Sequence, residues 1–219
     1  MLHEITAQHI SELTIDTNKP LVICDVDEVV LHFVRGLENY LETQGLWLDP
    51  ASFALNGNIK EIASNTPIEN SRVGPLLKHF FATCVGSLDA IEGAADALDE
   101  LSDSADVVML TNMPHDYRDA RIENLHGHGM PYPVVSNTGS KGAAIHALAS
   151  EVTKPVFFLD DTPDNLHSSA DTCPDVINIH FIQDDRFGRH LTVIDRFSLR
   201  TNNWNESQIF MRKHLEHHG

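Results

Sequence analysis

The sequence predicts an α/β protein built on a doubly wound parallel sheet, with a small helical cap inserted after the first strand. Five short runs rich in valine, isoleucine and phenylalanine show little polar alternation, which is typical of strands covered by helices on both faces. Helical patterns lie between these runs, and one interval is far longer than an ordinary crossover. The five runs are Leu21–Cys24, Asp106–Asn112, Tyr132–Asn137, Pro155–Asp161 and Asp175–Ile182.

Helices are expected in the intervals around the later strands. Apolar residues recur at helical spacing from Ile91 to Leu101, ahead of the second strand. Residues that commonly start and stop helices bound three further segments. The first segment starts at Asn112 and Pro114 and ends at Gly127 and Gly129. The second starts at Ser140, and the third starts at Asp161 or Thr162 with Pro163 in its first turn. The alternation of strands and helices indicates right-handed crossovers.

The interval between the first and second strands is the long one. Asp25 and Thr111 are 86 residues apart (111 − 25), and helical patterns surround Leu37–Leu41 and Leu76–Leu88 within it. We therefore expect a mainly helical insertion over residues 34–86, above the carboxyl end of the first strand. The core would then consist of residues 1–33 and 87–219. Its tail after Ile182 is expected to be irregular chain followed by a helix.

Charge and composition limit the classes of partner. The chain has 32 acidic and 15 basic residues, a formal net charge of −17, which disfavours binding to nucleic acid or to anionic membrane surfaces. Three scattered cysteines fit no disulfide framework, and no apolar run is long enough to span a bilayer. The first residues do not read as a signal peptide, so a cytoplasmic protein is expected. The oligomeric state is not defined by the sequence.

Polar side chains follow the apolar runs where the predicted strands end. Each of these residue types alone is commonly a turn or cap residue. In an open parallel sheet, however, ligands bind at the carboxyl ends of the strands, so we expect these side chains to meet at one edge. They are Asp25 and Asp27, Thr111 and Asn112, Asp160 and Asp161, and Lys141 at the start of a helix.

This set of residues suits phosphoryl transfer. Carboxylates such as Asp25, Asp160 and Asp161 are the oxygen ligands that Mg²⁺ prefers. A carboxylate can also act as a nucleophile, giving an aspartyl-phosphate, while a second carboxylic acid protonates the leaving oxygen. Lys141 and the Thr111 hydroxyl would hold the phosphoryl oxygens.

Taken in order, these motifs resemble those of the haloacid dehalogenase-like superfamily. The first motif is similar to "DVDEV", which contains Asp25 and Asp27, and the second to "VVMLTN", which contains Thr111. The third is similar to "SKGAA" with Lys141, and the fourth to "FFLDDTPDN" with its acidic pair. The resemblance covers roughly residues 20–182.

The resemblance implies that Asp25 is the nucleophile and Asp27 the general acid and base. It implies a metal held by the Asp25 carboxylate, the Asp27 backbone carbonyl and Asp161, with Asp160 close by. It also implies a phosphoryl group bound by Thr111 and Lys141, and we place Asn112 in the same phosphate-binding set. An acidic residue at the position of Asp27 is typical of phosphatases and phosphomutases in this superfamily, and the insertion resembles a small cap. A Mg²⁺-dependent phosphomonoesterase acting on a small phosphorylated metabolite is therefore expected.

Two alternatives remain open. A phosphomutase or phosphotransferase would use the same intermediate and differ only in the acceptor of the phosphoryl group. A catalytically silent domain of the same fold would instead bind a partner. Candidate residues for recognising a leaving group within the insertion are Arg35, Arg72, Lys78 and His79.

Overall fold

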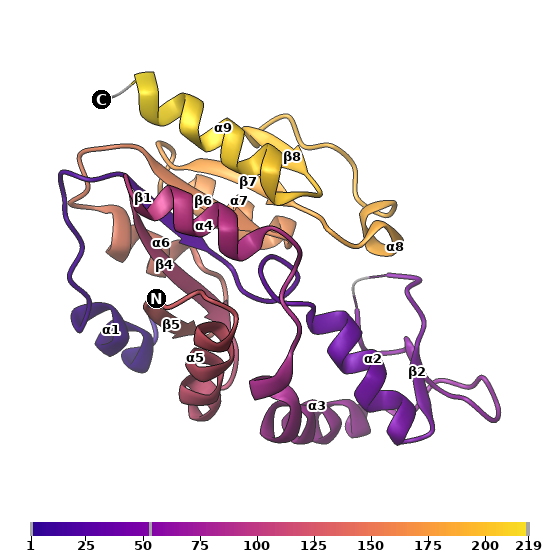
Figure 1. Ribbon diagram of the computed structural model, residues 1–219. Helices are drawn as coiled ribbons and strands as arrows, with labels where there is room; N and C mark the ends of the chain where they lie inside the picture. Colours follow the sequence, from indigo (N-terminus) through magenta and orange to yellow (C-terminus); the bar gives the residue numbers. More distant parts are fainter. Residues whose placement is uncertain (1, 53, 218–219) are drawn as a thin grey trace.

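A six-stranded parallel sheet forms the centre of the protein, in a computed structural model that describes residues 2–52 and 54–217 (Figure 1). The strand order is β5-β4-β1-β6-β7-β8, so β1, which precedes Asp25, lies inside the sheet. All five predicted strands are present, and the sixth lies at the edge. Their bounds are β1 (Leu21–Cys24), β4 (Asp106–Asn112), β5 (Val134–Asn137), β6 (Val156–Asp160), β7 (Ile177–Phe181) and β8 (Leu199–Thr201).

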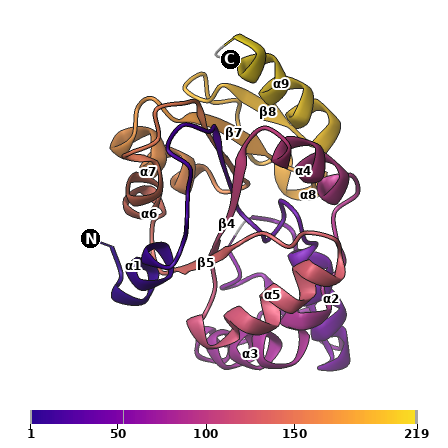
Figure 2. The same cartoon turned by 60° about the vertical axis from the view of Figure 1, so that its left-hand side comes forward.

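Helices cover both faces of this sheet, as a doubly wound fold requires (Figure 2). Alternate residues of β1 enter different clusters: Leu21 and Ile23 pack on one side, Val22 and Cys24 on the other. One face carries α1 (Glu4–Ser11), α6 (Gly142–Ala149) and α7 (Pro163–Thr172). The other carries α4 (Ala94–Ser102), α5 (Arg118–Gly127) and α9 (Trp204–His217). The predicted doubly wound α/β core is confirmed.

The long insertion between β1 and β4 contains helices and a small sheet. Its elements are α2 (Phe33–Thr43), β2 (Leu46–Leu48), β3 (Ile59–Glu61), α3 (Asn70–Cys84) and η1 (Val85–Ser87). The two expected helices are present, but β2 and β3 form an antiparallel pair that the sequence did not predict. Strands of three residues are too short to show a diagnostic alternation of apolar and polar residues.

The tail after β7 is more regular than expected. It contains α8 (Asp185–Gly188), the edge strand β8 and α9. The indole Nε1 of the buried Trp204 donates a hydrogen bond to the Val29 carbonyl at 2.8 Å. The tail therefore braces the loop that follows Asp27.

Some predicted helix starts are displaced. Ser140 does not cap α6; Lys141 precedes this helix, and the Gly142 amide donates to the Ser168 hydroxyl at 3.1 Å. Asn112 does not cap a helix either, since a short 3₁₀ turn, η2 (His115–Tyr117), precedes α5. The N-terminal α1 was not predicted, and Thr6 joins it to β5 through a hydrogen bond to the Ser136 carbonyl.

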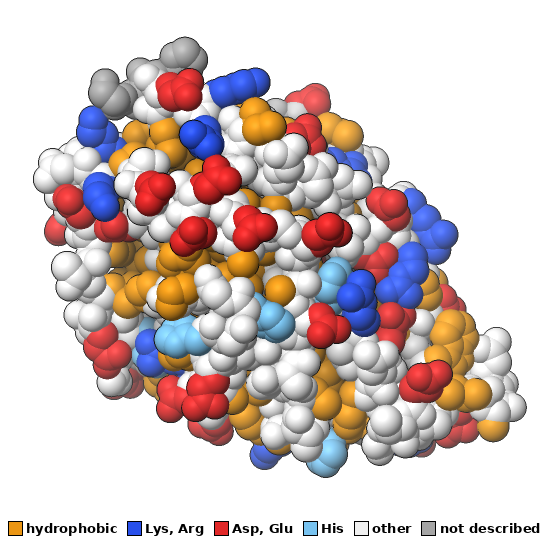
Figure 3. Space-filling model, in the orientation of Figure 1, with side chains coloured by type: hydrophobic (Ala, Val, Ile, Leu, Met, Phe, Trp, Pro, Cys, Tyr) orange, Lys and Arg blue, Asp and Glu red, His pale blue; other side chains and the backbone are white. Residues whose placement is uncertain are grey.

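Acidic side chains are prominent on the surface, in keeping with the net charge of −17 (Figure 3). Within the described part of the chain, no helix has both the length and the apolar character needed to cross a membrane.

Candidate active site

Asp25 stands where β1 ends, between the neighbouring strands β4 and β6. Its amide continues the ladder by donating to the Leu159 carbonyl at 2.9 Å, and its own Oδ1 accepts from the Val26 amide at 2.7 Å. The residue is only 6% exposed. The chain then turns sharply, because the Val26 carbonyl accepts from the amides of Val30 and Leu31. The strand thus fixes the Asp25 carboxylate at the sheet edge.

Lys141 joins two of the predicted aspartates. Its Nζ lies 2.6 Å from Asp25 Oδ1 and 2.7 Å from Asp160 Oδ2, and its side chain is fully buried. Burial disfavours the charged ammonium, but the two carboxylates outweigh it and hold the pKa of Lys141 above its usual value. The structure therefore places a fixed positive charge beside Asp25.

Asp25, Asp160 and Asp161 form a cluster whose nearest carboxylate oxygens all lie within 4.8 Å of one another. Burial raises the pKa of Asp25 to about 7; Lys141 opposes this shift and Asp160 adds to it. Burial and the same neighbouring carboxylates raise the pKa of Asp161 well above its usual value. Three acidic groups around one ammonium leave negative charge uncompensated, so this oxygen-rich cluster fits a hard divalent cation.

Asp160 is the best-satisfied member of the cluster. Besides Lys141, it accepts hydrogen bonds from the Thr162 amide at 2.8 Å and from Asn165 Nδ2 at 3.2 Å. These bonds fix its carboxylate, which in turn holds Lys141 in place. The Asp161 carboxylate has fewer hydrogen bonds to the described residues: it accepts one from the Thr162 hydroxyl at 3.1 Å.

Asp27 is paired with a residue that the sequence did not suggest. Arg121 Nη2 of α5 lies 2.7 Å from Asp27 Oδ1, and the arginine side chain is fully buried. None of the three guanidinium nitrogens makes a well-aligned hydrogen bond to a described residue. A clue existed in the sequence: Arg121 and Asn124 occupy the inward face of α5 together with Leu125, where apolar residues are the norm.

Thr111 and Asn112 end β4. The Thr111 hydroxyl is buried and has no partner among the described residues, which is costly unless a ligand supplies one. Asn112 lines the cavity described next, but Asn112 Nδ2 donates to the Gly139 carbonyl at 2.9 Å and its Oδ1 accepts from Asn137 at 2.8 Å. Its side chain thus braces the loop before Lys141, and a direct contact with phosphate stays a prediction.

A cavity of about 550 Å³ lies between the strand ends and the insertion. Asp25, Asp27, Lys141 and Asp161 line its polar end. Glu28 also lines it; burial raises the pKa of Glu28 to about 7, which the hydrogen bond from the Val34 amide partly offsets.

The four residues expected to recognise a leaving group do not line this cavity. Arg72 instead lies 3.5 Å from Glu61, and His79 Nδ1 is 3.0 Å from the Tyr40 hydroxyl. The remaining two, Arg35 and Lys78, are also absent from the residues that line it. All four residues are exposed and none lines the cavity, so the structure does not support them as residues that recognise the leaving group.

No known family model matches the sequence, and no curated protein matches it. Solved structures do. The haloacid dehalogenase-like protein SP0104 from Streptococcus pneumoniae is 12% identical, with a TM-score of 0.60, over 89% of this chain and 99% of that one. The haloacid dehalogenase-like protein ATU0790 from Agrobacterium tumefaciens is 14% identical, with a TM-score of 0.62, over 88% of this chain and 97% of that one.

A defluorinating L-2-haloacid dehalogenase, Rha0230, is similar to the same extent: 12% identity and a TM-score of 0.60 over 91% of this chain and 99% of that one. The chain therefore has the fold of the haloacid dehalogenase-like proteins. The neighbours span hydrolases and a dehalogenase, so the reaction has to be argued from the site itself.

Proposed function

We propose that the protein is a Mg²⁺-dependent phosphomonoesterase that forms an aspartyl-phosphate on Asp25. The observation that supports this most strongly is the buried Asp25–Lys141–Asp160 arrangement, which opens onto a cavity beside two further carboxylates, Asp27 and Asp161. A haloalkane-type substrate would not call for a second acid beside the nucleophile, whereas an ester oxygen that leaves needs a proton.

The carboxylates of Asp25 and Asp161 and the Asp27 backbone carbonyl would hold the metal, with Asp160 alongside. When bound, Mg²⁺ would supply positive charge that offsets the carboxylates and the phosphoryl oxygens. The support for this fit is the geometry: the nearest carboxylate oxygens of Asp25, Asp160 and Asp161 lie within 4.8 Å of one another beside a single ammonium, that of Lys141.

The chain's own residues perform the two chemical steps. Asp25 attacks phosphorus, the bond to the ester oxygen breaks, and Asp27 gives that oxygen its proton. Asp27 then takes a proton from a water molecule that attacks the aspartyl-phosphate, which releases inorganic phosphate and restores Asp25. Lys141 and the Thr111 hydroxyl hold the phosphoryl oxygens through both steps.

In this proposal the insertion, residues 34–86, acts as a cap over the strand ends. Its side chains cover the cavity above the strand ends, and a cover of this kind limits the access of water during the first step. Phosphotransfer to a second substrate would need the same residues, so the acceptor is the point to be measured. A silent binding domain is less favoured because the buried ion pairs of Lys141 with Asp25 and Asp160 adjoin a cavity that could hold a substrate.

Hydrolysis of 4-nitrophenyl phosphate, followed with Mg²⁺ and with EDTA, tests the proposal. We expect metal-dependent release of one phosphate for each ester consumed, and its loss in the Asp25→Asn variant. A deficit of phosphate relative to consumed ester would indicate a transferase instead. Undiminished turnover in the variant would disprove the role of Asp25.

We further propose a cytoplasmic location and a small metabolite as the natural substrate.

A further inference from the structure

Resting on the proposed function, we infer that the natural ester has an apolar alcohol part without a second negative charge. Glu28 is the residue that rejects esters carrying one. The inference concerns the end of the cavity away from Lys141, where the leaving group would lie.

The insertion supplies an apolar wall to the cavity. Its contribution is a set of six aliphatic and aromatic side chains from α2, β2, the following loop and α3, and Ile182 and Phe187 add to this wall from the core. The six are Phe33, Val34, Leu37, Leu48, Leu55 and Phe81. An apolar body would bury its surface against this wall, and a strongly hydrated sugar or sugar phosphate would lose water there without compensation.

The charges that line the cavity are almost all negative. Six carboxylates line it, and Lys141 is the single cation among the described lining residues. Its ammonium is already held between Asp25 and Asp160, at 2.6 and 2.7 Å. A second phosphate or a carboxylate on the substrate would therefore meet no free cation within this lining.

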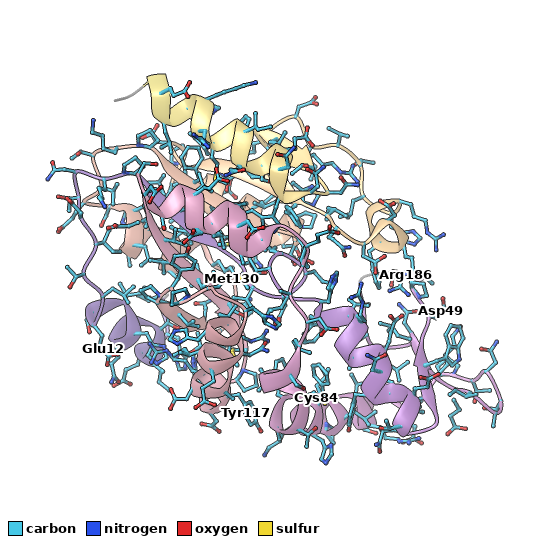
Figure 4. The ribbon with its side chains drawn as sticks, viewed as in Figure 1. Glu12, Asp49, Cys84, Tyr117, Met130 and Arg186 are labelled. Carbon is cyan, nitrogen blue, oxygen red and sulfur yellow. The ribbon has the colours of Figure 1, made fainter. Side chains whose placement is uncertain are left out.

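Two arginines lie just outside this lining, and both are already paired with carboxylates. Arg121 contacts Asp27 at 2.7 Å, and Arg186 lies on α8. Figure 4 shows Arg186 on the side that meets the insertion. Its guanidinium is bound to Glu38 of α2 at 2.7 Å and to Asp184 at 2.7 Å, and of these three only Asp184 lines the cavity. Its positive charge is thus already paired with two carboxylates, one of which, Asp184, belongs to the lining.

Glu28 lines the cavity beside the proposed acid, Asp27. It follows Asp27 directly and adopts a left-handed backbone with φ +61°, which side chains other than glycine seldom adopt. Its Oε1 accepts a hydrogen bond from the Val34 amide at 2.7 Å, which holds the carboxyl group between the catalytic loop and α2. A strained residue of this kind at a catalytic loop is a candidate for a functional role.

Binding of three matched phosphonates, measured by calorimetry at mildly alkaline pH, where Glu28 is ionised, and with Mg²⁺ present, tests this inference independently of turnover. The probes are benzylphosphonate and its 4-carboxy and 4-aminomethyl derivatives. We expect the carboxy compound to bind about tenfold more weakly than the parent, because a like charge in a partly desolvated cavity is repelled. The aminomethyl compound should bind at least as tightly as the parent.

Three variants identify the residue responsible. Glu28→Gln removes the charge and keeps the shape, and Glu28→Gly removes the side chain and relieves the left-handed strain. In both variants, the ratio of the Kd of the carboxy compound to the Kd of benzylphosphonate should be at least threefold closer to one than in the native protein. Glu151→Gln removes one negative charge from an exposed site elsewhere, and should leave the ratio unchanged.

Equal or tighter binding of the carboxy compound by the native protein would overturn the inference, as would no binding of any probe. A ratio that Glu28→Gln and Glu28→Gly both leave unchanged would overturn the role of Glu28. Preferential binding of benzylphosphonate over its carboxy derivative, without hydrolysis of phenyl phosphate, would support this inference while disproving the phosphatase proposal.

Discussion

Replacing the proposed nucleophile should stabilise the metal-free protein at alkaline pH. In the Asp25→Asn variant, the side chain keeps its shape and loses its charge. The native residue is 6% exposed and its pKa is raised to about 7, so its carboxylate is held ionised at a cost in folding free energy. Such a cost is common where function requires a destabilising arrangement.

The sign follows from proton linkage. The folded protein keeps a proton on Asp25 up to about pH 7, whereas the unfolded chain loses it near its ordinary pKa of 3.8. The folded state therefore binds more protons between these values, and native stability falls as pH rises through that window. Each pH unit below the folded pKa is worth about 1.4 kcal/mol, and the dependence ends above that pKa. Stability should therefore decline by about 2 kcal/mol from about pH 5.5 to 8.

Urea unfolding of both proteins in EDTA measures this quantity. We expect the stability of Asp25→Asn relative to the native protein to rise by about 2 kcal/mol between about pH 5.5 and 8. Comparing the two proteins cancels the titration of the other acidic groups to first order. Mg²⁺ at the higher pH should shrink the difference, because the native cluster binds it more tightly. A difference that is constant with pH, or that falls, would refute the assigned environment of Asp25.

Three further perturbations test other contacts. Lys141→Met leaves two carboxylates without their shared ammonium, so urea unfolding in EDTA at about pH 8 should show a loss of about 3–5 kcal/mol; a loss below about 1 kcal/mol would contradict the buried ion pairs. Arg121→Met removes the contact that positions the Asp27 carboxyl group, so proton donation to the leaving oxygen should suffer. The fall in kcat should be at least about tenfold larger for phenyl phosphate than for 4-nitrophenyl phosphate, whose leaving group needs no acid. Equal effects on both esters would indicate a purely structural role. Arg186→Gln should cost less than about 1 kcal/mol in the same unfolding assay, since the side chain is 44% exposed, and a larger loss would show that its bridge to α2 stabilises the insertion.

Much of the fold was accessible from the sequence because the buried parallel strands are continuous apolar runs. The same runs located the site, since the carboxyl ends of β1, β4 and β6 share one edge of the sheet. Asp25, Asp160 and Asp161 accordingly meet there, with Lys141 between two of them. Their catalytic roles stay predictions until they are measured.

The features that sequence reasoning missed depend on distant contacts or on very short segments. β8 has only three residues and includes Arg200 and Thr201, so no apolar run marks it. Arg121 reaches Asp27 from another part of the chain, and only the packed structure shows the pair. Glu28 carried no signal either, because its left-handed backbone cannot be inferred from its residue type.

Trapping the intermediate tests the central claim most directly. The Asp27→Asn variant should still transfer the phosphoryl group of 4-nitrophenyl phosphate, whose leaving group needs no proton, but should hydrolyse the acyl-phosphate slowly. After an acid quench and digestion, mass spectrometry should find about 80 Da added to the peptide that contains Asp25. The adduct should require Mg²⁺ and be absent when Asp25 is also replaced by Asn. An adduct on another residue, or rapid hydrolysis with no adduct at any time point, would contradict nucleophilic catalysis by Asp25.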